Sequence, residues 1–334
     1  MRGLRQESRH VLRVLPLAFL TACAVEDAPS ILEPAGPAAA RVEGLWWFLF
    51  WISVVVFLVV LALMMMALRR RGRIEDPIVE DEPRWGEPFV ALSGVVIPWI
   101  ILTIAFVISL GVMRQIATAE EAADLTIEVK GRMWWWEVRY PNGAVTSTEI
   151  HIPVGERVDV RLTSADVIHS FWVPELQVKI DQIPGRENSL WLQADKPGRY
   201  RGQCAEFCGL QHANMIFTVI AEPREDFEAW VANEAQRARE PTGTGLRGRD
   251  VFMDNSCVGC HAIRGTDAAA ELGPDLTHLA SRSTLGSAIL PNTRENLSRL
   301  ITEPQRVKPG VTMPPTSLSR QDLNALLDYL GQLE

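Results

Sequence analysis

Two long apolar runs constrain the fold of this chain more than any other feature of its sequence. The first, residues 45–68, contains no acidic or basic side chain, and the second covers residues 88–113. Each run reaches the roughly 20 residues that a helix needs to cross a hydrocarbon core of about 30 Å. Because a helix satisfies its own backbone hydrogen bonds, we expect two membrane-spanning helices.

The arginines between the two runs predict how this hairpin is oriented. Arg69, Arg70, Arg71 and Arg73 follow the first run at once, and positive charge is retained on the cytoplasmic side of a membrane. Both outer ends of the hairpin then lie on the opposite side. The sequence therefore predicts a two-pass protein of a bacterial inner membrane, with residues 69–87 in the cytoplasm and everything after Arg114 on the periplasmic side.

The N-terminal segment predicts export. Residues 1–22 combine an arginine-rich start with an apolar run too short to span a bilayer, which is typical of a signal peptide. The run ends in Leu20-Thr21-Ala22-Cys23, which resembles the lipobox of bacterial lipoproteins. We therefore expect a lipid on Cys23, with an ordinary signal peptide and a chance cysteine as the alternative. The Pro- and Ala-rich stretch 28–40 is expected to be a flexible spacer.

The region 124–222 predicts an all-β domain. Apolar residues alternate in it, which indicates strands with one buried face, and turn residues separate the strands. A β-sandwich or a barrel is the expected fold. The alternating positions are Ile127 and Val129, then Val158, Val160 and Leu162, then Leu190 and Leu192.

The net charge of the chain, −8, and the lack of a concentrated basic face argue against nucleic acid as a partner.

The stretch QCAEFCGLQHANM, residues 203–215, predicts a metal site. Its two cysteines, histidine and methionine, with His169 upstream, form the soft ligand set that favours copper over hard cations. A disulfide between Cys204 and Cys208 is one alternative, since exported domains favour disulfides. Zinc is the other, although a Cys2His2 zinc site would give Met215 no role. A single blue copper needs only one thiolate, so the second cysteine suggests two bridged metal ions.

The spacing C-x3-C-x3-H-x2-M, together with DVIHSFWVPE upstream, resembles subunit II of haem-copper cytochrome c oxidases. The resemblance implies a cupredoxin sandwich with a dinuclear Cu(A) centre, in which two cysteines bridge the coppers, two histidines cap them, and a methionine and a backbone carbonyl are weak ligands. Carried over, the ligands are Cys204 and Cys208, His169 and His212, Met215, and the carbonyl of Glu206.

The same resemblance gives roles to two more residues. Trp134 aligns with the aromatic residue at which electrons enter, and the Glu206 carboxylate would help hold a magnesium ion at the interface with the catalytic subunit. Trp134 to Trp136 are consecutive, and alternation would leave at least one exposed unless a partner covers it. His151 is expected to be an unpaired surface residue. One departure is Ala91, which stands where the family often has an acidic residue near a proton pathway.

A third domain is predicted after a charged helical stretch at 226–239 and a Pro/Gly linker. Cys257-Val258-Gly259-Cys260-His261 is the C-x-x-C-H motif, in which two cysteines attach haem c covalently and the histidine binds iron. The alternative, a redox-active C-x-x-C pair, needs a β-α-β pattern that the sequence lacks. Helices are expected at 246–254 and 321–333.

An electron-transferring haem needs a second axial ligand, and Met313 on a proline-rich loop is the expected one, with Met253 packing instead. Gly273-Pro274 resembles the segment of class I cytochromes c whose proline carbonyl orients the haem histidine. His278 is expected to contact a haem propionate or to lie at the surface.

Together these features resemble subunit II of a caa-type cytochrome c oxidase. The fold class is then a transmembrane hairpin, an all-β cupredoxin and an all-α cytochrome c domain. The expected boundaries are 1–22 signal peptide, 23–44 lipidated lead, 45–68 and 88–113 helices, 114–225 cupredoxin, 226–244 helix and linker, and 245–334 cytochrome c.

The implied function is to carry electrons from a cytochrome c-like or other periplasmic donor, through haem c and Cu(A), to the haems of the catalytic subunit I, coupled to oxygen reduction and proton pumping. Other oxidase subunits and membrane lipid are the further partners. A free-standing membrane-tethered carrier is the alternative, but two spanning helices exceed what a tether needs. A nitrous oxide reductase would need a histidine-rich catalytic domain, and quinol oxidases lack the two cysteines.

Overall fold

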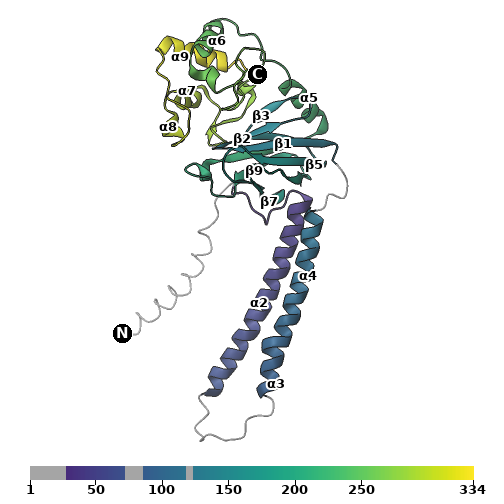
Figure 1. Cartoon of the computed structure of the whole chain (residues 1–334). Helices are drawn as coiled ribbons and strands as arrows, with labels where there is room; N and C mark the ends of the chain where they lie inside the picture. The colour runs from purple at the N-terminus through teal and green to yellow at the C-terminus, as the bar shows by residue number, and fades with distance from the viewer. Residues whose placement is uncertain (1–27, 72–85, 118–122) are drawn as a thin grey trace, which may run out of the picture.

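The computed structural model describes residues 28–71, 86–117 and 123–334. The predicted signal peptide and Cys23 therefore lie outside the described residues. The described residues form a long helical hairpin, a β-sandwich at one end of it, and a helical domain against the sandwich (Figure 1).

The hairpin consists of two apolar helical segments. Helix α2 (Pro37–Arg71) forms the first, and α3 (Gly86–Ala91), η2 (Leu92–Val96) and α4 (Ile97–Ala117) form the second. Both are long and apolar enough to cross a membrane, and the most apolar window of each has no buried residue. Apolar side chains left open on a pair of helices are suited to contact with lipid. The two predicted apolar spans are thus present as helices.

The start of α2 differs from the flexible spacer expected over 28–40. The main chain of Ala35 accepts a hydrogen bond from Asp195 and donates one to Glu175, each 2.8 Å long. A Cβ on Gly36 would lie 2.2 Å from the carbonyl oxygen of Gln193, so only glycine allows this approach. The helix begins directly afterwards, at Pro37. The sandwich therefore holds the chain in place before it enters the hairpin.

A π-helical turn lies at the start of the second segment. Pro98 has no N–H and cannot continue the ordinary hydrogen-bond ladder. Just before it, the Ile97 N–H bonds to the carbonyl of Leu92, five residues back. The widened turn thus accommodates the proline that the sequence places inside the apolar run.

The β-sandwich has two five-stranded sheets, ordered β3-β2-β1-β5-β8 and β4-β10-β9-β6-β7. Most neighbouring strands are antiparallel, but β1 with β5 and β4 with β10 are parallel. The alternating apolar residues of the sequence all face the core and are buried. The strands are β1 (Leu125–Arg132), β2 (Trp135–Arg139), β3 (Val145–Ser147), β4 (Glu149–Pro153), β5 (Val158–Ser164), β6 (His169–Val173), β7 (Gln177–Gln182), β8 (Asn188–Leu192), β9 (Gly198–Cys204) and β10 (Ile216–Glu222).

An aromatic cluster fills the core beneath the predicted metal loop. Phe171 and Phe217 stack with ring centroids 4.5 Å apart, and Trp136 meets Phe217 edge-on at 5.0 Å. A Cβ on Gly202 would lie 2.2 Å from the Phe217 ring, so glycine makes this packing possible. Close packing of rings gives the neighbouring loop a rigid base.

The three consecutive tryptophans do not share one strand. Strand β1 ends at Arg132 and β2 begins at Trp135, so Trp134 lies in the turn between them. Trp134 and Trp136 are buried, at 8% and 0% exposure. Trp135 is half-buried beneath the guanidinium of Arg132, 5.5 Å from its ring centroid. None of the three is therefore fully exposed.

His151 is not the unpaired surface residue that the sequence suggested. Helix α5 (Arg224–Glu234) returns across β4, and its Trp230 stacks on the His151 ring at 3.7 Å. The Nδ1 atom of His151 lies 2.8 Å from a carboxylate oxygen of Glu222. The expectation was wrong because a strand pattern gives no sign of a helix that later covers the same residue.

The helical domain is built on two packed helices, α6 and α9. Their backbones come close because residue 248 is glycine: a Cβ there would lie 1.9 Å from the carbonyl oxygen of Ala325. Phe252 and Tyr329 meet edge-on in the core, with centroids 6.1 Å apart. The elements are α6 (Thr244–Asp254), η4 (Ser256–Gly259), η5 (Leu279–Ser281), β11 (Thr284–Leu285), β12 (Leu290–Pro291), α7 (Arg294–Thr302), α8 (Pro304–Val307) and α9 (Arg320–Leu330).

Candidate copper and haem sites

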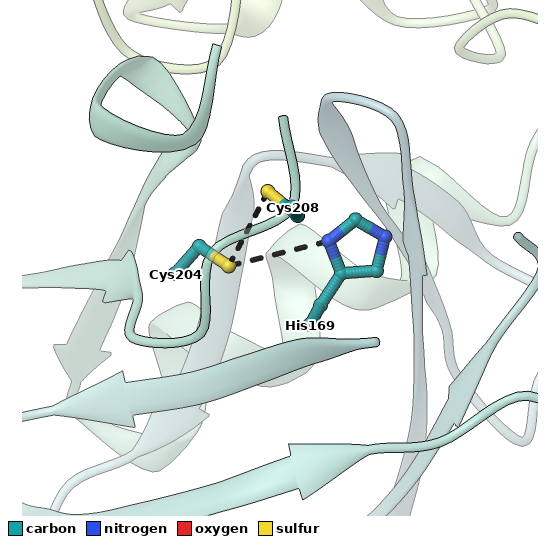
Figure 2. Close-up of side chains that lie close together, drawn as sticks. All are labelled: His169, Cys204 and Cys208. Carbon is teal, nitrogen blue, oxygen red and sulfur yellow. Dashed lines mark hydrogen bonds between the residues drawn. The ribbon is translucent and has the colours of Figure 1, made fainter. Parts of the chain in front are cut away.

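The predicted copper ligands gather at one end of the sandwich. Cys204 ends β9, Met215 directly precedes β10, and His169 begins β6. Figure 2 shows the Cys204 sulfur joined by dashed lines to the His169 ring and to the Cys208 sulfur. Strands β6 and β9 pair directly, which brings a histidine far upstream in the sequence to the loop.

The Cys204 sulfur contacts three of the other predicted ligands. It lies 3.7 Å from the Cys208 sulfur, 4.0 Å from Nδ1 of His169 and 3.2 Å from the carbonyl oxygen of Glu206. Because Cys204 and His169 are both buried, water does not compete for this face of the site.

The Cys208 sulfur contacts the two remaining predicted copper ligands, His212 and Met215. It lies 3.7 Å from Nδ1 of His212 and 3.8 Å from the Met215 sulfur. The six atoms that the resemblance assigns to copper are therefore brought together: the two free cysteine sulfurs and the four atoms in contact with them. The short helix η3 (His212–Asn214) turns the histidine back toward the loop.

The two thiols strongly influence each other's ionisation. The hydrogen bond between the two sulfurs lowers the pKa of Cys204, whereas the same bond, together with burial, raises the pKa of Cys208. Two thiolates this close repel unless a cation lies between them. Two sulfurs, two imidazole nitrogens, a thioether and a carbonyl fit a copper pair, and they include two donors for which tetrahedral zinc has no use.

Asp166 orients the upstream histidine, a role that the sequence reading did not assign. Its carboxylate lies 2.8 Å from Nε2 of His169, so Nδ1 is directed to the cysteines. Asp166 also accepts hydrogen bonds from the main-chain N–H groups of Met133 and Val167. These bonds lower the pKa of Asp166 despite the opposing effect of burial. The one feature of the sequence that could have indicated this role is the position of Asp166, three residues before His169.

Glu206 presents its two oxygen-bearing groups to different sides. The carbonyl faces Cys204, whereas the side chain is 46% exposed and lies 3.6 Å from Nζ of Lys179. Beside it, Phe207 and Leu210 are 77% and 78% exposed. An exposed apolar pair beside a buried metal site is the kind of surface that a partner covers.

The haem-attachment motif forms one tight turn. The main-chain N–H groups of Cys260 and His261 both bond to the carbonyl of Cys257, at 3.1 and 3.0 Å. Nδ1 of His261 donates to the carbonyl of Pro274 at 2.8 Å, which leaves Nε2 free for iron. A Cβ on Gly273 would lie 2.6 Å from the His261 ring. Burial lowers the pKa of His261, so the imidazole is held in its neutral, metal-binding form.

Arg282 provides a further test of whether the domain fits a haem. The residue is 8% exposed, and its guanidinium donates hydrogen bonds to the Ser147 hydroxyl and to the carbonyl of Asp275. Its Nε is buried with no hydrogen-bond partner among the described residues. Haem carries two carboxylates that such a donor can bind, so these residues fit the group.

Met313 and Met253 both pack against the core of the helical domain. Met313 is half-buried, and Gln305 shapes its loop by donating to the carbonyl of Val311 and accepting from Gly310. His278 is buried at 2% exposure and bonds to the carbonyl of Gln236, so a surface position for it is excluded.

Trp134 lies between the copper loop and the helical domain. Its indole Nε1 donates to the carbonyl of Cys208 at 2.8 Å, and its own carbonyl accepts from Lys308 and Ser287 of the helical domain. The partner that covers this tryptophan is thus another part of the same chain. The sequence did not reveal Lys308 or Ser287, because no motif contains them.

These features define a membrane protein with a metal-binding sandwich and a haem-binding domain on its periplasmic side, and comparisons with known proteins identify its family. The family described as "Cytochrome C oxidase subunit II, periplasmic domain" matches residues 144–222, and "Cytochrome c" matches residues 246–334. "Cytochrome c oxidase subunit 2" of Alkalihalophilus pseudofirmus is 38% identical over 96% of this chain and 97% of its own length. The protein of the same name from Bacillus sp. strain PS3 is 32% identical over 80% of each chain.

The chain belongs to the cytochrome c oxidase subunit II family, in the form with a fused cytochrome c domain. It is thereby a subunit of a haem-copper oxidase, as the sequence predicted, and its two domains imply Cu(A) and a haem. Among solved structures, the periplasmic domain of subunit II from Bradyrhizobium japonicum is 35% identical, with a TM-score of 0.34, over 35% of this chain and 96% of that one.

Proposed function

We propose that this subunit carries electrons from a periplasmic donor through covalently bound haem c to dinuclear Cu(A), and from there to the haems of the catalytic subunit, where oxygen reduction is coupled to proton pumping. The observation that supports it most is the convergence of four further ligand-type groups on two cysteine sulfurs 3.7 Å apart. When bound, the copper pair and the haem each gain or lose one electron.

The residues that would hold these groups are those that the sequence predicted. Cys204, Cys208, His169, His212, Met215 and the Glu206 carbonyl would hold the two coppers, and their contacts around the two cysteine sulfurs support this assignment. Cys257 and Cys260 would attach the haem, and His261 and Met313 would bind its iron. A rigid sandwich keeps the copper ligands in nearly one geometry, so that little reorganisation accompanies electron transfer.

The surface beside the copper loop is where we place the catalytic subunit. Phe207 and Leu210 are exposed and apolar, and the Glu206 carboxylate projects next to them. A magnesium ion prefers oxygen ligands and retains waters, so one carboxylate from each side of an interface is a suitable site for it. We also place the protein in the bacterial inner membrane, with a lipid on Cys23.

Rapid-mixing spectroscopy of the full-length chain loaded with both groups tests this function. A one-electron donor in limiting amount should reduce the haem first, and the electron should then appear on copper. Copper that stays oxidised while the haem remains reduced would contradict the proposed order.

A further inference from the structure

Residues 308–311, the docking segment, join the predicted haem ligand to the sandwich. The carbonyl of Pro309 accepts a 2.8 Å hydrogen bond from Gln211 of the copper loop. A Cβ on Gly310 would lie 2.7 Å from the Leu210 side chain and 3.6 Å from the Trp134 ring. Val311 packs against the sandwich core, and Met313, two residues later, packs in the helical domain. One short segment thus contacts both domains.

Lys308 attaches this segment to Trp134. Its ammonium donates to the carbonyl of Trp134 at 2.6 Å, to the carbonyl of Gly286 at 3.0 Å and to the hydroxyl of Ser287 at 2.7 Å. Lysine has three N–H donors, and all three are used. The side chain is only 4% exposed, so water does not replace these bonds.

Ser287 contributes a second hydrogen bond to the same oxygen, at 2.7 Å. It lies in a run of three left-handed residues, with φ of 64° at Gly286, 68° at Ser287 and 60° at Ala288. Non-glycine residues rarely adopt this conformation because it is strained for them, so the surrounding contacts must hold them there. The structure therefore maintains a costly turn that directs two donors at one carbonyl.

The ammonium is also costly to bury. Among the described residues it forms no salt bridge, and burial lowers the pKa of Lys308 to about 7. An apolar residue would pack at this position at lower cost, because an unpaired buried charge is strongly disfavoured. The burial of this ammonium therefore indicates that Lys308 has a role other than stabilising the fold.

We propose that Lys308 is a positioning residue, which fixes the docking segment on Trp134 and so sets the route from the haem domain to the copper loop. The inference rests on the proposed function, in which one electron leaves the reduced haem and reaches the oxidised copper pair with no bond or proton exchanged. The route runs from the Met313 loop through Val311 and Gly310 to the Trp134 ring, and from its Nε1 to the Cys208 carbonyl. It also follows that an external donor meets the haem domain, because Trp134 is covered.

Two measurements on the full-length, fully loaded chain test this role in Lys308→Met. Hydroxyl-radical footprinting reports the exposure of Trp134, and rapid mixing reports the haem-to-copper rate. Loss of hydrogen bonds to buried carbonyls should raise Trp134 modification and lower the rate by about tenfold each. The copper absorption spectrum should stay as in the wild type, which separates lost docking from damage to the copper ligands. Ser287→Ala removes one of the two bonds and should show a smaller effect in the same direction.

Glu271→Gln is the matched control. This variant breaks another contact between the two domains, the exposed salt bridge between Glu271 and Arg139. Neither residue of this salt bridge contributes to the hydrogen bonds on Trp134. Exposed pairs contribute little, so both readings should stay at the wild-type level. Wild-type footprinting and rate in both Lys308→Met and Ser287→Ala would overturn the positioning role. A wild-type chain that transfers no electron from haem to copper would instead overturn the proposed function, while footprinting would still decide whether Lys308 docks the segment.

Discussion

The indole Nε1 of Trp134 donates a 2.8 Å hydrogen bond to the carbonyl oxygen of Cys208, so the covered tryptophan is joined directly to a predicted copper ligand. This contact places the ring between the copper loop and the segment that leads to Met313. It gives a physical basis to the role that the resemblance implied for Trp134.

Trp134→Phe tests that role. Phenylalanine keeps a ring but removes the donor to Cys208, so haem-to-copper transfer should slow by about tenfold or more, since small misplacements of a reacting pair are costly. Copper content should stay at the wild-type value. Trp135→Phe is the control, because Trp135 packs under Arg132, whereas the hydrogen bond to the Cys208 carbonyl comes from Trp134. An unchanged rate in Trp134→Phe would exclude the ring's N–H from the route.

Asp166→Ala should weaken copper binding. Without the carboxylate, His169 loses the partner that directs Nδ1 to the cysteines, and loss of such an outer partner lowers metal affinity by about 10- to 100-fold. Competition with a copper chelator measures the change. Asp181→Ala is a control on the neighbouring strand, since Asp181 pairs with Lys179 at the surface. Equal affinities in the two variants would contradict the orienting role of Asp166.

Met313→Ala should leave the haem covalently attached but open its sixth coordination position. The reduced iron should then bind carbon monoxide, and the reduction potential should fall. Met253→Ala is the comparison, because Met253 packs in the same core and is not expected to bind iron. A Met313 variant that still resists carbon monoxide would mean that another residue is the axial ligand.

Glu206→Ala should distinguish the role of the backbone carbonyl of this residue from the role of its side-chain carboxylate. The backbone carbonyl that faces Cys204 is retained, so both coppers should bind in the full-length chain. Loss of the carboxylate should lower the magnesium content of the assembled oxidase and slow electron transfer to the catalytic subunit. Metal analysis and stopped-flow reduction of the complex measure both effects. Wild-type magnesium together with a wild-type rate would remove the carboxylate from the interface.

The sequence predicted the parts of this protein whose signal is local. The apolar runs and the alternating strands each depend on neighbours in the chain, and they are present in the structure as helices and strands. The C-x-x-C-H motif is equally local, and it forms a tight turn. The loop from Cys204 to Met215 also carried its own pattern, and the resemblance supplied the distant His169.

The contacts between elements far apart in the sequence could not be predicted. Lys308 reaches Trp134 across 174 residues and belongs to no motif. The burial of His151 under Trp230, and of His278 beside Gln236, arises from packing that a strand or loop pattern does not encode. The sequence likewise gave no sign that Ala35 is hydrogen-bonded to the sandwich, so the segment before the hairpin is held in place and is not the flexible spacer that was expected.

Copper content and electron paramagnetic resonance of the full-length chain test the central claim most directly. The wild type should bind two copper ions, with one unpaired electron shared equally between them, because Cys204 and Cys208 can both bridge. Cys208→Ser removes one bridge and should leave at most one copper with a localised signal. A wild-type chain that binds a single copper, or zinc in preference to copper, would contradict the account.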